Sequence, residues 1–142
     1  MSTRTPSTAL VLFRTRAERT IESHRQEFSK LGQQLVDVSG SQEGYTYYLN
    51  RMDPFWKKAA EVDVFSTCLH WMRRMEKEWG EPGLNDVKVA AFFKELSAQA
   101  LSTIRQHARY STQSTSSLSN LAEREKAAAW EKVLGHLEEL LP

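Results

Sequence analysis

The stretch that decides the fold is residues 8–38, TALVLFRTRAERTIESHRQEFSKLGQQLVDV. Its apolar residues recur at alternating intervals of four and three, which is typical of an α-helix that packs lengthwise on other helices. These residues are Leu10, Ala17, Ile21, Phe28, Leu31, Leu35 and Val38. Gly32 weakens such a helix by about 1 kcal/mol relative to alanine, and Gly40 suits its end. We therefore expect one long N-terminal helix.

Two polar residues, Arg14 and His24, occupy positions in this apolar seam. A charged side chain in an apolar contact is costly unless it pairs or reaches water. The sequence leaves two possibilities open: the helix packing loosens at these positions, or they meet acidic groups of another protein. Self-association and packing against other protein subunits are therefore expected modes of interaction.

Two helices are expected in the middle of the chain. Residues 45–52 form a short helix with one apolar face. Asp53 and Pro54 then start a longer helix, because proline suits the first helical turn and aspartate caps it. Asp63 offers a second starting point, since the apolar periodicity of residues 64–79 is stronger than that of the residues before it.

The segment after residue 79 predicts a loop and then another helix. Residues 80–83, Gly-Glu-Pro-Gly, have a loop composition. Asn85 or Asp86 can start the next helix, which is expected to end at Tyr110. Its apolar face is predicted to consist of Val89, Phe92, Phe93, Leu96, Ala100 and Ile104.

The two most polar segments are expected to lie outside the helices. Residues 1–8 are predicted to be a flexible lead-in, and the Ser/Thr-rich residues 111–119 an internal linker. The last helix starts near Asn120, with Glu123 as its capping-box partner. No stretch alternates apolar and polar residues as a strand would. We therefore predict a single all-α domain over residues 1–142, a bundle of about five helices.

Composition and charge exclude several classes of protein. The 142 residues carry 19 Lys and Arg against 18 Asp and Glu, a net charge of +1 that excludes a uniformly polycationic binder. The apolar run of residues 9–13 is far too short for a membrane span or a signal peptide. Cys68 is the only cysteine, so no intrachain disulfide can form. We expect a cytoplasmic protein without a membrane partner.

The chain lacks the motifs that would indicate catalysis or metal binding. The four histidines, His24, His70, His107 and His136, do not occur at ligand spacing. Cys68 and His70 would point to different faces of one helix. No phosphate-binding loop, dinucleotide fingerprint or nucleophile elbow occurs. The sequence therefore predicts a protein that is not an enzyme and needs neither metal nor cofactor.

Basic and aromatic residues cluster between residues 45 and 58, and more basic groups follow at intervals. Arginine and lysine contact phosphates and exposed aromatic rings stack on bases, so this interleaving favours binding to RNA or single-stranded DNA. Alternatively, the aromatic rings belong to the core and the cations surround them. The predicted nucleic-acid-binding residues are Tyr47, Arg51, Lys57, Lys58, Arg73, Arg74, Arg105 and Arg109.

Residues 48–54, YLNRMDP, and residues 64–71, VFSTCLHW, resemble the small helical subunits of CRISPR effector complexes. In that family a helix with tyrosine and basic residues leads to a proline and then to an apolar helix. Asp63 stands where the family often has a glycine. The resemblance implies a non-enzymatic antiviral-defence subunit that packs along a ribonucleoprotein filament and steadies guide or target strands.

The sequence favours two functions, while a third, a small helical enzyme or ligand carrier, would require a deep pocket that a sequence does not reveal. The first is a non-enzymatic subunit of a nucleoprotein assembly, which contacts the nucleic-acid backbone through its basic and aromatic surface. The second is a protein–protein adaptor or chaperone without nucleic acid. The second is favoured by the apolar seams at the two ends of the chain and by the excess of acids after residue 119.

Overall fold

The protein is an all-α bundle in the computed structural model, which describes residues 5–38, 52–79, 85–110, 112 and 117–141. The helices are α1 (Pro6–Val38), α3 (Met52–Trp79), α4 (Asp86–Tyr110) and α5 (Ser117–Leu140). The all-α prediction is confirmed for these residues. They form four helices rather than about five, and the short helix predicted for residues 45–52 lies outside them except for Met52.

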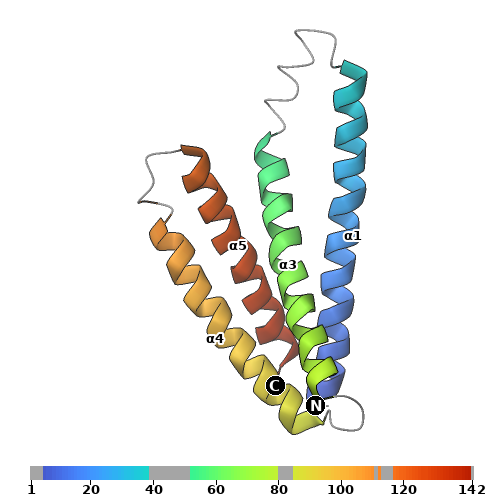
Figure 1. Ribbon diagram of the computed structural model, residues 1–142, viewed down its shortest axis with the longest axis vertical. Helices are drawn as coiled ribbons and strands as arrows, with labels where there is room; N and C mark the ends of the chain where they lie inside the picture. The colour runs from blue at the N-terminus through green and yellow to red at the C-terminus, as the bar shows by residue number, and fades with distance from the viewer. Residues whose placement is uncertain (1–4, 39–51, 80–84, 111, 113–116, 142) are drawn as a thin grey trace.

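The helices run alternately up and down in chain order, so α1 and α4 share one direction and α3 and α5 the other (Figure 1). α5 packs along both α4 and α3, and α1 packs mainly on α3 and also on α4. α3 and α4 make few direct contacts with each other. α3 and α4 are therefore held apart by α1 and α5, on which both of them pack.

The starts of α1 and α4 are capped and tied together. The backbone N–H of Thr8 donates to Thr5 Oγ1 at 3.2 Å, so α1 begins at Pro6 and the predicted lead-in of residues 1–8 is too long. The N–H of Lys88 donates to Asn85 Oδ1 at 3.0 Å, which confirms Asn85 as the cap of α4. The Asp86 carboxylate accepts bonds from the backbone N–H and the hydroxyl of Ser7.

Two other predicted helix starts are wrong. α3 continues through Asp63, whose backbone carbonyl accepts a bond from the Thr67 hydroxyl, so no new helix begins there. α5 begins at Ser117 instead of Asn120, so the last three residues of the predicted linker are helical. Serine has a low helix propensity, but a helix that packs on two neighbours overrides such local preferences.

The core lies between the lower halves of the four helices, as Figure 1 is drawn, and aromatic rings meet within it. Phe13 and Phe93 pack edge to face with their ring centroids 6.3 Å apart, and Trp71 stacks on Trp130 at 5.8 Å. In α4 the predicted face is buried as expected, although Ile104 only packs against the core from its edge. Burying these apolar side chains supplies the main favourable free energy of folding.

Candidate binding surfaces

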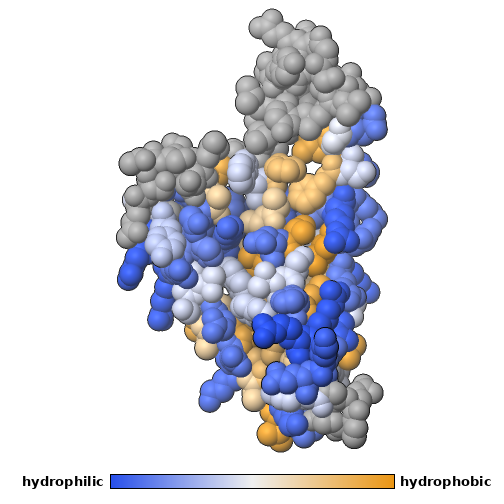
Figure 2. Space-filling view, in the orientation of Figure 1, coloured by the Kyte–Doolittle hydropathy of each residue, from blue (hydrophilic) through white to orange (hydrophobic). Residues whose placement is uncertain are grey.

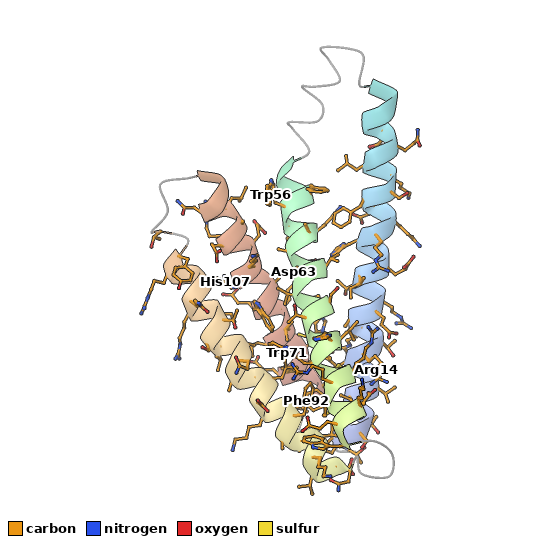
Figure 3. The ribbon with its side chains drawn as sticks, viewed as in Figure 1. Arg14, Trp56, Asp63, Trp71, Phe92 and His107 are labelled. Atoms are coloured by element: carbon orange, nitrogen blue, oxygen red, sulfur yellow. The ribbon has the colours of Figure 1, made fainter. Side chains whose placement is uncertain are left out.

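The two polar residues in the α1 seam are paired within the chain. Arg14 forms an ion pair with Glu76 of α3, and His24 Nε2 lies 2.5 Å from Glu61 Oε2, also on α3. Figure 3 labels Arg14 near the lower end of α1. Neither residue therefore requires the acidic groups of another protein, which removes one of the arguments for an external partner.

Glu61 joins three helices. Its side chain is only 5% exposed, and it accepts bonds from His24 of α1 and from Lys132 of α5. Burial by itself raises the pKa of this carboxyl, but the bonds from Lys132 and His24 outweigh burial and hold the pKa below its usual value. Glu61 is the one charged residue buried among the described residues, and its charge is matched on both sides.

Two more polar bridges hold α5 in place. Arg16 of α1 makes two bonds of 3.0 Å to the Glu139 carboxylate, and its Nη1 also lies 3.2 Å from His136 Nδ1. His107 of α4 pairs with Glu123 of α5, so Glu123 bridges two helices where the sequence predicted a capping role. These histidines serve the fold.

Cys68 and the described metal-ligating side chains do not form a reactive group of their own. Burial raises the pKa of the Cys68 thiol to about 12, so this cysteine is a core residue and not a nucleophile. In the described part of the chain no three histidine, cysteine or acidic side chains gather as a metal site would require. No helix among the described residues is long and apolar enough to cross a bilayer.

The predicted phosphate contacts on α3 do not form one surface. Tyr47 and Arg51 lie outside the described residues. Lys57 is exposed, whereas Lys58 pairs with Glu27 of α1. Arg73 lies in a groove toward α1 and Arg74 in another toward α4, and each groove also contains two glutamates. Cations beside carboxylates are poorly placed to attract phosphates.

Arg105 and Arg109, in contrast, share one acid-free surface at the C-terminal half of α4. We call it the α4 outer face. It is a shallow depression of about 710 Å³ lined by Ala98, Leu101, Ser102, Arg105, Gln106, Arg109 and Tyr110. Leu101 is 47% exposed and Tyr110 is 44% exposed, both high values for large apolar side chains. This surface combines cations, an aromatic ring and an uncovered leucine.

A second hollow, the α3–α4 groove, lies between the two helices that scarcely touch. Its volume is about 400 Å³. Its apolar lining consists of Trp71, Met75, Trp79, Phe92 and Leu96, and its polar lining of Arg74, Glu78, Glu95 and Gln99. Figure 3 labels Trp71 and Phe92, which come from the two helices that line this groove. This groove could not be predicted from the sequence, because helical periodicity does not indicate which two helices leave a gap between them.

Apolar side chains also reach the surface between the upper parts of α1 and α3 (Figure 2). Here Phe28 and Phe55 pack with their ring centroids 5.1 Å apart, beside Leu31 and the paired residues Glu27 and Lys58.

Comparison with known proteins brings no further guide to function: no family model, no curated protein and no solved structure matches the chain. The resemblance of residues 48–54 and 64–71 to small CRISPR subunits therefore stays a prediction.

Proposed function

We propose that this chain is a non-enzymatic helical subunit of a nucleoprotein assembly, and that the α4 outer face contacts the nucleic-acid backbone. One observation supports the proposal: Arg105 and Arg109 are exposed, lie one helical turn apart, and share a surface that no acidic residue lines in the described part of the chain. Among the other predicted phosphate contacts, Lys58, Arg73 and Arg74 each lie beside carboxylates. The resemblance to small CRISPR subunits adds the expectation that the nucleic acid is RNA.

The chemistry of this face suits a flexible single strand. A guanidinium group donates two parallel hydrogen bonds to a phosphate, and two such groups one turn apart can follow successive phosphates. Tyr110, at the end of the same face, offers a ring on which an unpaired base can stack. The polar groups inside the bundle join helices, which fits a role in binding better than a role in catalysis.

The experiment is binding of a short single-stranded RNA to the full chain at low and at moderate salt. Replacing both arginines (R105E and R109E) should weaken binding on the order of tenfold or more, because two attractive contacts become repulsive. The matched control reverses two exposed cations elsewhere, R19E and K77E, with the same change in net charge. Equal affinity of the two double variants would reject the α4 outer face as the contact.

The second candidate function is a protein adaptor, and the exposed Leu101 is the observation that favours it. Beside Ala98 it forms an apolar strip on which another helix could pack. RNA binding absent even at low salt, together with association that Leu101→Glu abolishes, would favour the adaptor. Light scattering of the wild-type chain and this variant measures that association.

A further inference from the structure

The α3–α4 groove is an opening that the packing of the bundle leaves uncovered. α3 and α4 both pack on α5 and on α1, but hardly on each other, and Trp71 and Trp79 on α3 stay partly exposed beside the gap. Met75 and Leu96 form its buried base, and Trp71, Trp79 and Phe92 line it as well. Its volume of about 400 Å³ is within the range of sites that hold a large side chain or a small ligand.

The aromatic part of the groove is held in place from behind. Trp71 stacks on Trp130 of α5 with 29° between the ring planes, so the ring is fixed before anything binds. Phe92 packs against Phe93 of the core at 5.8 Å. Tryptophan, phenylalanine and methionine are enriched where proteins bind partners, because the aromatic rings present large rigid apolar faces and methionine adapts its shape to what it contacts.

The charges at the edge of the groove favour a cation. Glu78 of α3 and Glu95 of α4 form no ion pair with any other described residue, while Arg74 is the only basic residue in the lining. Arg74 lies one helical turn from Glu78 and can neutralise it. Glu95 then remains as the unbalanced charge, and the lining as a whole carries one more acidic than basic group.

The protein itself already provides one example of the expected contact. The ammonium group of Lys88 lies over the Trp79 ring, 5.5 Å from its centroid. A cation at this position is attracted by the electron-rich face of the indole. This contact leaves Trp71 as the partly exposed ring that a second cation could cover, because Phe92 is only 9% exposed.

We propose that the α3–α4 groove binds an arginine side chain of a protein partner. Its planar guanidinium would stack on the aromatic wall and donate paired hydrogen bonds to the Glu95 carboxylate, which lysine cannot do in the same plane. Its methylene groups would lie above the buried base that Met75 and Leu96 form. Two glutamates disfavour a phosphate here, so this site is separate from the α4 outer face and does not depend on the proposed function.

The test uses the full chain and two capped peptides, leucine–arginine–leucine and the same peptide with citrulline, the uncharged analogue of arginine. The probes are the indole N–H signals in NMR spectra. Trp71 and Trp79 should shift with the arginine peptide and much less with citrulline. Trp56, near the start of α3 and far from Trp71, should not move (Figure 3).

Two substitutions in the groove should change the affinity for the arginine peptide in opposite directions. Glu95→Gln should weaken binding of the arginine peptide about fivefold, because it removes the charged acceptor. Arg74→Gln should strengthen it by a similar factor, because it frees Glu78. Glu131→Gln, on the exposed side of α5, is the matched control and should change nothing.

Equal shifts with both peptides would overturn the proposed arginine site and leave an apolar groove. Absence of any shift at Trp71 and Trp79 would overturn binding there altogether. Arg105 and Arg109 lie outside this groove, so R105E and R109E should leave the peptide-induced shifts unchanged. Failure of the arginine site and failure of the proposed RNA contact can therefore be told apart.

Discussion

The interior of the bundle and the α4 outer face use charged side chains in opposite ways. In the interior, Glu61 is enclosed between His24 and Lys132, and nearer the surface Arg16 of α1 holds Glu139 of α5 with two hydrogen bonds. On the outer face, no acidic residue among those described lines the depression that Arg105 and Arg109 share. A charge that is matched within the fold contributes to stability, whereas an unmatched charge at the surface is free to meet a partner. Substitutions in the two regions should therefore affect different measurements.

The largest expected effect is a loss of stability from the buried side of α4. Phe93 is 1% exposed and packs edge to face on Phe13. Phe93→Ala should lower the free energy of unfolding by about 3–5 kcal/mol, because it creates a cavity between α1 and α4. Leu101→Ala, on the outer side of the same helix, is the control and should change it by about 0.5 kcal/mol or less. Urea denaturation followed by circular dichroism measures both.

The second-largest loss of stability is expected from the buried Glu61, which bridges His24 and Lys132. Glu61→Gln should destabilise the protein by about 2 kcal/mol, because His24 and Lys132 lose the negative charge that they share. The change is smaller than for Phe93 because the Lys132 side chain is 49% exposed and can reach water. Glu138→Gln, an exposed acid on α5, serves as the control. Equal midpoints of urea denaturation for the two variants would contradict a structural role for Glu61.

The third effect is a loss of stability in acid. Burial lowers the pKa of His136, with Arg16 and Lys132 acting in the same direction and Glu139 opposing them. Below the usual pKa of 6.5 the unfolded chain binds this proton before the folded chain does, so stability falls as the pH drops. Below about 4.5 the lowered pKa of Glu61 adds a further loss.

His136→Gln separates these two contributions, because glutamine cannot take up the proton. Urea midpoints at about pH 7 and about pH 5.5 should differ less in this variant than in the wild type. The control is His70→Gln, since His70 is exposed on α3. A wild-type midpoint that does not change between the two pH values would contradict the role given to His136.

The helices could be predicted from the sequence better than the contacts between them. The four-three spacing identified α1, and all five buried positions of α4 lay on its predicted face, because helical periodicity reports which side is covered. The spacing does not report which helix covers that side. The bridge at Glu61 could therefore not be found, although a histidine in the seam at position 24 indicated that some polar partner was needed.

The candidate site was predictable only in part, for a similar reason. Arg105 and Arg109 lie four residues apart, so their common face follows from the sequence alone. The distribution of Lys58, Arg73 and Arg74 over different sides of α3, each near acids, depends on the neighbouring helices. The same is true of the α3–α4 groove, whose aromatic residues come from two helices with a loop between them.

One double variant, Arg105→Gln with Arg109→Gln, should have the smallest effect on stability. It also tests the proposed function most directly. It should change the free energy of unfolding by about 0.5 kcal/mol or less, because both residues are exposed and neither forms an ion pair with another described residue. The decisive measurement is the salt dependence of its affinity for a single-stranded RNA, compared with that of the wild type. The slope of log affinity against log salt should become shallower by about 1.4, because two phosphate contacts are lost. An unchanged slope would contradict the central claim that the α4 outer face contacts the nucleic-acid backbone.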